Sequence, residues 1–149
     1  MAIRVQIEDF DVGLELNKLR LANPNIGALV SFIGQVRDIN DGNAINTLLL
    51  EHYPEMTEKA LTAIENEAKT RWDIIGSLII HRVGTLQPLD QIVLFAVSSA
   101  HRSDAFSACE FIMDFLKTSA PFWKKETTNQ GERWVEAKLS DDAAKARWQ

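Results

Sequence analysis

Residues 91–118 read QIVLFAVSSAHRSDAFSACEFIMDFLKT and join a strand-like segment to an amphipathic helix. Gln91–Ser98 is apolar and β-branched, which predicts a strand. Ser103 is a good N-cap for a helix from about Asp104 to Thr118, and Pro121 must end that helix. One face of the helix carries the apolar stripe Phe106, Cys109, Met113 and Leu116. The segment therefore predicts a strand followed by a helix that packs on the core.

The N-terminal part predicts one helix and two strands. Asp11 or Asp9 can cap a short amphipathic helix carrying Val12, Leu16 and Leu19, which stops near residues 23–25. Ile26–Val36 and Ala44–His52 are rich in apolar and β-branched residues and lie on either side of the turn-like residues 40–43. We expect these two strands to form a β-hairpin with a long polar connection.

The rest of the chain alternates helices and strands without a strict order. Apolar residues recur every three or four positions from Pro54 to about Trp72, which predicts a helix. Ile74–Val83 and Gln91–Ser98 are expected as strands that flank a turn at residues 84–90. Near the C-terminus we expect strands at Trp123–Thr127 and Arg133–Ala137 and a helix from Ser140.

This order of elements favours an α+β fold over a doubly wound sheet. We expect a single domain over residues 1–149, with a mixed or antiparallel sheet and packed helices. The expected arrangement is α/β-hammerhead-like, with a small C-terminal β-hairpin.

Length, charge and cysteine content exclude several classes of protein. A chain of 149 residues fits one domain and can bury its own core. A net charge of −5 is the wrong sign for general nucleic-acid binding. One cysteine and three scattered histidines make a metal site improbable, and the cysteine content fits a reducing compartment. With no secretory signal and no long apolar run, we expect a cytoplasmic protein with no membrane partner.

The sequence lacks the common nucleotide, hydrolase and zincin motifs, so its clusters of cations stand out. His101 and Arg102 directly precede the expected helix, where backbone amides and the helix dipole attract anions. Arg37 follows a strand at the entry to a polar loop, where a guanidinium can hold a phosphate. Solvated surface positions remain the alternative for all three residues.

Lysines gather at the other end of the same helix. Lys117 lies in its last turn, and Lys124 and Lys125 follow beside Phe122 and Trp123. Lysine needs about 4 kcal/mol of perturbation to act as a base near neutral pH, and one like charge about 4 Å away supplies a similar amount. Repulsion can therefore activate one of these lysines. On spacing alone, Lys117 complementing the helix C-terminus and Lys124 and Lys125 coating a strand is the more common arrangement.

The length of the helix separates the two cationic groups. His101 and Arg102 lie about 15 residues from Lys117, or roughly 22 Å at 1.5 Å per residue. One small ligand cannot touch both ends within one chain. If both ends belong to one site, two chains must share it, which implies a two-fold homodimer. Cys109 falls on the apolar face of this helix, where a buried and inert thiol is expected.

The sequence resembles the family of the large, catalytic subunit of molybdopterin synthase, MoaE, over nearly its whole length. The segments that carry the resemblance are FIGQVR (32–37), LEHYPEMTEK (50–59), HRVG (81–84), SAHRS (99–103) and FIMDFLKTSAPFWKKE (111–126).

The resemblance implies a sulfurtransferase of molybdenum cofactor biosynthesis. Members of the family convert cyclic pyranopterin monophosphate to molybdopterin by inserting two sulfurs as a dithiolene. A small ubiquitin-like subunit supplies the sulfur as a thiocarboxylate on its C-terminal Gly-Gly tail, so no bound cofactor and no metal is expected. The implied assembly is a central homodimer with a small subunit at each end, a heterotetramer.

The resemblance also implies the site residues. Substrate contacts fall on Gln35, Val36, Arg37, His101, Arg102, Lys117, Lys124, Lys125 and Glu126. Lys117 is the expected main catalytic residue, acting as an amine or general acid/base, and Lys124 is expected to hold substrate and promote loss of the Lys117 proton. Phe32 and Met113 are expected to line the channel for the tail.

Two positions depart from the family pattern, and one other function stays open. Leu89 stands where relatives commonly have glycine, and Lys138 where arginine is frequent. The alternative is a non-catalytic dimeric module that uses the same cations to bind a phosphorylated metabolite or a partner's C-terminal tail.

Overall fold

Four helices and nine strands make up the part of the chain that the computed structural model describes, residues 2–40, 43–119, 122–135 and 139–148. In chain order they are β1 (Ala2–Gln6), α1 (Val12–Leu21), β2 (Ala28–Gln35), β3 (Ile39–Asn40), β4 (Asn43–His52), α2 (Met56–Arg71), β5 (Gly76–Arg82), β6 (Gly84–Leu86), β7 (Gln91–Ser99), α3 (Arg102–Ser119), β8 (Phe122–Thr128), β9 (Gly131–Val135) and α4 (Leu139–Ala146).

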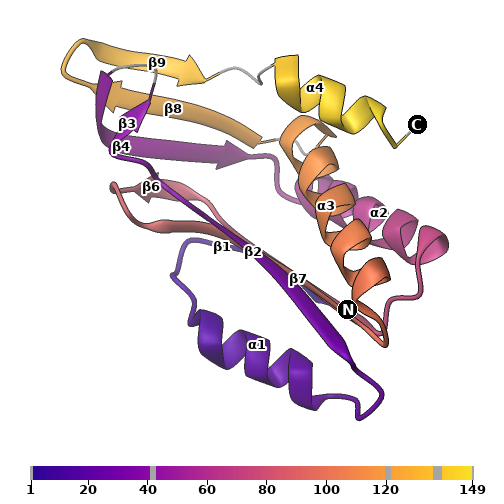
Figure 1. The fold of residues 1–149 in the computed structure, drawn as a ribbon. Helices are drawn as coiled ribbons and strands as arrows, with labels where there is room; N and C mark the ends of the chain where they lie inside the picture. The colour runs from indigo at the N-terminus through magenta and orange to yellow at the C-terminus, as the bar shows by residue number, and fades with distance from the viewer. Residues whose placement is uncertain (1, 41–42, 120–121, 136–138, 149) are drawn as a thin grey trace.

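The first sheet is mixed and carries helices on both faces. Its strand order is β1-β5-β7-β2. β1 runs parallel to β5, whereas β7 runs antiparallel to both β5 and β2. Figure 1 shows α1 on one face of this sheet and α2 and α3 on the other. The expected α+β fold class is confirmed.

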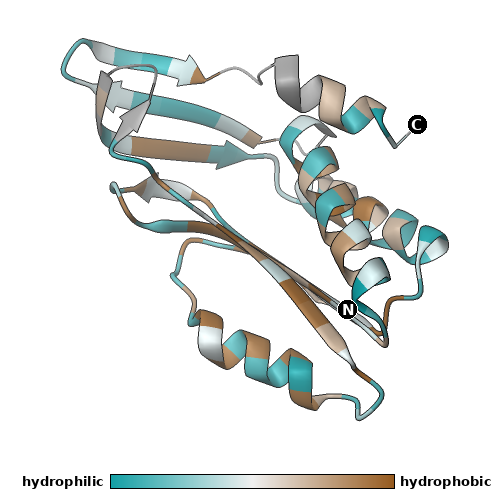
Figure 2. Cartoon of the chain, in the orientation of Figure 1, coloured by the Kyte–Doolittle hydropathy of each residue, from teal (hydrophilic) through white to brown (hydrophobic). Residues whose placement is uncertain are grey.

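Side chains of the central strands alternate between two apolar cores, as the pleat of a strand requires. Ile79 and Phe95 pack with residues of α2 and α3, whereas Ile80 and Leu94 pack on the side of α1. Figure 2 shows these strands mostly in the brown of hydrophobic residues. His81 has the same parity along β5 as Ile79, so the alternation directs its side chain to the α3 side of the sheet.

The second sheet has the order β3-β4-β8-β9, with β6 also paired to β4. All these pairings are antiparallel. The expected C-terminal hairpin is present as β8 and β9, but β8 pairs with β4, so the hairpin completes this sheet rather than standing apart. The turn expected at residues 84–90 contains β6.

The hairpin expected between Ile26–Val36 and Ala44–His52 is wrong. β2 pairs with β7 in the first sheet, and β4 pairs with β8 in the second. The polar connection between the two segments instead contains β3, which folds back on β4. Apolar content predicted both strands correctly, but their partners depend on burial against distant segments, and no tight two-residue turn joins the pair.

The expected helices are confirmed, with small differences at their ends. The Asp11 side chain accepts a hydrogen bond from the backbone N–H of Leu14 and caps α1. α3 begins at Arg102, so Ser103 lies in its first turn rather than before it. Just before the helix, the Oγ of Ser99 accepts a hydrogen bond from the backbone N–H of His101 at 3.4 Å. Pro121 and Ala137 lie outside the described residues.

None of the helices in the described ranges has an apolar stretch long enough to cross a bilayer.

Candidate active site

A pocket of about 330 Å³ lies where the end of β2, the last turn of α3 and the start of β8 come together. Its lining residues are Phe32, Ile33, Gly34, Gln35, Arg37, His81, Ile92, Val93, Met113, Leu116, Lys117, Phe122 and Lys124. Three of them are cations, and no carboxylate of the described residues is among them. An apolar wall with several convergent cations suits a small anionic ligand.

Lys117 reaches the pocket from the last turn of α3. It shares one face of the helix with Met113, four residues earlier, which also lines the pocket. The end of this helix is held by the C-terminal segment, because the Asp114 carboxylate accepts from Trp148 Nε1 at 2.6 Å and from Arg147 Nη2 at 2.9 Å. Lys117 therefore projects from a firmly anchored turn.

Lys124 reaches the pocket from β8, on the same face of the strand as Phe122. Lys125 points to the opposite face, where its Nζ lies 3.2 Å from a Glu132 oxygen and 5.3 Å from the centre of the Trp134 ring. The two neighbouring lysines therefore separate. Of the pair, only Lys124 lines the pocket.

Gln35 and Arg37 line the pocket from the end of β2, and Val36 does not. The pairing of β2 with β7 shifts register between Gly34 and Gln35, where Ile92 is the extra residue on β7, and Gln35 and Arg37 keep the two-residue alternation of an extended chain. Val36 is buried in a small core with Leu48, Leu50 and Leu86.

The turn at residues 87–90 fixes the end of β2. The Val36 N–H donates to the Asp90 carbonyl at 2.9 Å, and the Val36 carbonyl accepts from the Leu89 N–H at 2.7 Å. Leu89 itself has a φ of 74°, in the left-handed region that favours glycine. The departure from the family's glycine at this position therefore retains the glycine-type backbone. Lys138, the other departure, lies outside the described residues.

His81 is the polar residue of the pocket lining to which the sequence assigned no role. It is 2% exposed, and its ring stacks on Phe122 with centroids 3.8 Å apart. Burial lowers the pKa of His81 to about 3, and the nearby cations Lys124 and Lys117 act in the same direction. The HRVG segment did contain a signal for His81. The histidine stands at an inward position of an apolar strand, which directs its side chain to the core side that carries α3.

His101 and Arg102 lie at the opposite end of α3 from the pocket. The helix has 18 residues. Its two ends are therefore about 26 Å apart at 1.5 Å per residue, so within one chain these residues do not join Lys117. Both are exposed.

Glu126 does not line the pocket either. Glu126 is 3% exposed, and its carboxylate accepts from Arg133 Nε at 3.1 Å and Nη2 at 3.0 Å. A buried carboxylate in such an ion pair holds β8 to β9.

Cys109 is buried in the core between the first sheet and α3. Burial raises the pKa of this thiol to about 12, with a smaller contribution from Glu110. The expected burial of this thiol is confirmed, and its inertness stays a prediction, based on the small amount of the reactive thiolate at neutral pH.

Comparison with known proteins identifies the family of this chain. The family model described as MoaE protein matches residues 5–119. The chain belongs to the MoaE family. A molybdopterin synthase catalytic subunit from Ralstonia nicotianae is 62% identical over 146 residues, which cover 98% of this chain and 83% of the relative.

Solved structures agree with the family assignment. The molybdopterin biosynthesis MoaE protein from Burkholderia ambifaria has a TM-score of 0.85 and 58% identity, and the match covers 99% of this chain and 98% of that one. A protein–protein complex of subunits 1 and 2 of molybdopterin-converting factor from Helicobacter pylori shares the fold, with a TM-score of 0.74, 18% identity and 90% coverage of each chain. The function expected from the sequence, that of an enzyme of molybdopterin synthesis, is confirmed by this MoaE membership.

Proposed function

We propose that the pocket is the place where this chain converts cyclic pyranopterin monophosphate to molybdopterin, with both sulfurs taken from the C-terminal thiocarboxylate of a small ubiquitin-like subunit. The observation that carries the proposal is the convergence of Arg37, Lys117 and Lys124 on one partly apolar pocket. The phosphate and the thiocarboxylate are both anions, and such a pocket attracts them. A volume of about 330 Å³ is within the range of small-ligand sites.

Lys117 is the proposed catalytic residue. It acts as an amine or a general acid/base at the thiocarboxylate and the pterin carbons. Lys124 holds substrate and repels positive charge on Lys117. Two such charges about 4 Å apart repel by about 4 kcal/mol at an effective dielectric of 20, which favours loss of one proton.

Phosphate binding is proposed for Arg37 with Gln35, because both line the pocket from the end of β2. His101 and Arg102 join the site only from a second copy of the chain, because α3 holds them far from Lys117. A two-fold homodimer with two shared sites satisfies this requirement.

A small subunit is the proposed sulfur donor, and no cofactor bound to this chain is involved. The Helicobacter pylori structure of the same fold is a complex of two subunits, which supports a partner subunit here. Phe32 and Met113 line the pocket together and are proposed to border the channel for the partner's tail. With one small subunit on each half of the homodimer, the assembly is a heterotetramer.

The direct test mixes the purified chain, a thiocarboxylated small subunit and cyclic pyranopterin monophosphate, and measures the dithiolene product. We expect Lys117→Ala to lose turnover by two orders of magnitude or more while still binding the small subunit. Lys18→Ala, on the exposed surface of α1, is the matched control and should keep full turnover. Absence of product with the unmodified chain would favour the non-catalytic binding module, and full activity of Lys117→Arg would exclude proton transfer by Lys117.

Complementation between two inactive variants tests the shared site. One chain carries Lys117→Ala and the other carries both His101→Ala and Arg102→Ala. After subunit exchange, half the dimers are mixed and each has one intact site, so about a quarter of the sites recover. No recovery in a mixture shown to contain mixed dimers would contradict the shared site.

A further inference from the structure

His81 occupies a fixed position in the wall of the pocket. Its ring stacks on Phe122 at an interplanar angle of 14°, and its Nδ1 lies 2.7 Å from the Arg82 carbonyl oxygen. A carbonyl oxygen can only accept, so Nδ1 carries the proton and donates a hydrogen bond to the Arg82 carbonyl oxygen. The lone pair of the neutral ring therefore lies on Nε2.

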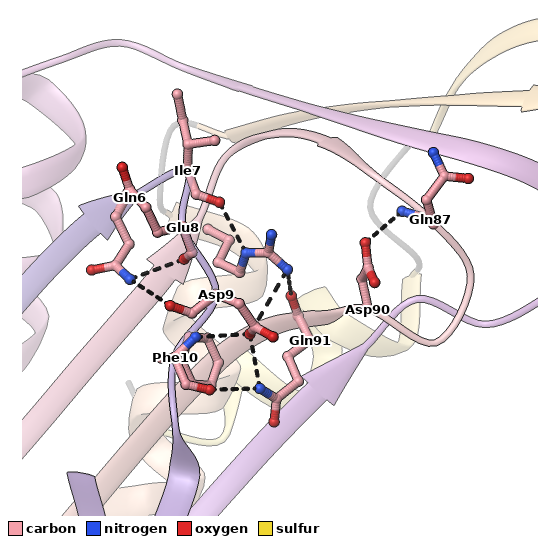
Figure 3. Close-up of polar contacts among 9 residues, drawn as sticks. Gln6, Ile7, Glu8, Asp9, Phe10, Gln87, Asp90 and Gln91 are labelled. Carbon is pink, nitrogen blue, oxygen red and sulfur yellow. Dashed lines mark hydrogen bonds and ion pairs between the residues drawn. The ribbon is translucent and has the colours of Figure 1, made fainter. Parts of the chain in front are cut away.

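The acceptor for Nδ1 is itself held in place. The Arg82 guanidinium donates from Nε to the Ile7 carbonyl at 3.1 Å and from Nη1 to the Gln91 carbonyl at 3.0 Å. Figure 3 shows this surrounding network, in which the Gln91 side chain also donates to Asp9 Oδ1 at 2.9 Å and to the Phe10 carbonyl at 3.0 Å. The neighbouring residue thus fixes the backbone that orients the His81 ring.

Basic side chains approach the ring from several elements. They are Lys124 on β8, Lys117 on α3 and His52 on β4, and Arg37 lines the same pocket. Of the first three, Lys124 lowers the pKa of the His81 ring the most. It also lies two residues from Phe122 on the same face of β8, next to the ring on which His81 stacks.

We propose that His81 is a positioning residue, whose Nε2 accepts a hydrogen bond from the Lys124 ammonium and so keeps Lys124 as the protonated lysine of the pair. An ammonium donates a stronger hydrogen bond than a neutral amine, so a fixed neutral acceptor favours the charged form of Lys124. Lys117, which lines the same pocket, then carries the amine or general acid/base role of the proposed function. A neutral ring serves this purpose better than an imidazolium, which would repel Lys124. This assignment rests on the proposed function of the pocket.

Three variants separate the contacts of His81. His81→Phe keeps an aromatic ring against Phe122 and removes both nitrogens. His81→Asn keeps a donor near the position of Nδ1, and His81→Gln keeps an acceptor near the position of Nε2. All three are compared in thermal unfolding and in binding of the small subunit, so that loss of fold is detected separately.

The first measurement needs no turnover and so does not depend on the proposed function. The ¹⁵N-detected ammonium signal of Lys124, assigned by its loss in Lys124→Arg, reports an immobilised and hydrogen-bonded ammonium. We expect this signal in the unmodified chain and in His81→Gln, and its loss in His81→Phe and His81→Asn. The same signal in all four proteins would overturn the proposal. A ¹⁵N spectrum of His81 with the proton on Nε2 would also overturn it.

The second measurement is turnover with the thiocarboxylated subunit. We expect kcat to fall about tenfold or more in His81→Phe and His81→Asn, with His81→Gln within about threefold of the unmodified chain. Full activity in His81→Asn with loss in His81→Gln would show that the ring only tethers the Arg82 carbonyl, and would refute the positioning role. If the unmodified chain makes no product while the ammonium signals behave as expected, the proposed function fails and the contact between His81 and Lys124 stands.

Discussion

Acidification from pH 7 to pH 5 should destabilise this protein through His81. The folded chain holds the ring neutral, with a pKa of about 3, whereas the model value that applies to an unfolded chain is 6.5. Between these two values the unfolded chain binds a proton that the folded chain does not. The contribution to stability is therefore complete above pH 6.5 and is lost as the pH falls toward 3.

The expected size follows from the same two pKa values. At pH 5 the unfolded imidazole is protonated almost completely, which lowers the free energy of unfolding by about 2 kcal/mol relative to pH 7. For a chain of this length the loss corresponds to a fall in Tm of about 4–8 °C. The buried carboxyl of Glu65 has a raised pKa and acts in the opposite direction, so a matched comparison is needed.

The assay is thermal and urea unfolding of the unmodified chain and His81→Gln across pH 5–7. Because glutamine does not titrate, the two stability curves should converge by about 2 kcal/mol as the pH falls. Curves that stay parallel would refute the buried neutral state of His81. If the variant does not fold, an NMR titration of the unmodified chain gives the same answer, because the His81 ring signals should not move over this range.

Two substitutions and one labelling experiment test other residues. Leu89→Gly should raise stability by about 0.5–1 kcal/mol in urea unfolding, because the left-handed penalty of about 1–2 kcal/mol exceeds the entropic cost of glycine, and lower stability would contradict the strained turn. Glu65→Gln keeps an acceptor for the Ser77 hydroxyl and removes the carboxyl whose pKa is raised by burial, so it should stabilise the protein at pH 7 with a gain that shrinks as the pH falls. Cys109 should react with iodoacetamide at pH 8 about a thousandfold more slowly in the folded chain than in urea, and rapid labelling of the folded chain would show that the thiol is accessible.

Local patterns were enough to predict the four helices and most of the strands, though not β1, β3 or β6, and several of the residues that line the pocket. The helices followed from apolar spacing and from the Asp11 cap, which act within a few residues. Lys117 could be placed at the end of its helix for the same reason. The opposite orientations of Lys124 and Lys125 also follow from the two-residue period of a strand, once β8 is known to have one face toward the pocket.

Non-local contacts were the part that the sequence could not supply. The partners of β2 and β4 depend on which segments bury them, and neighbouring position in the chain suggested the wrong pair. The environment of His81 could not be predicted for the same reason, because its burial, its stack on Phe122 and its cationic neighbours depend on three distant segments. Val36 was expected at the site from the resemblance, but its side chain is buried in the small core with Leu48, Leu50 and Leu86.

The register of β8 on β4 determines which side chains of β8 face the pocket, because alternate residues of a strand point to opposite faces. Lys124 stands opposite Leu50, and Phe122 stands opposite His52. Sliding β8 by one residue would present Trp123 and Lys125 to the cavity and turn Phe122 and Lys124 outward. His81 would then lose its aromatic platform and its cationic neighbour in a single step. A variant that alters the spacing of this strand would therefore resemble a double active-site knockout, even with every side chain of the machinery still encoded.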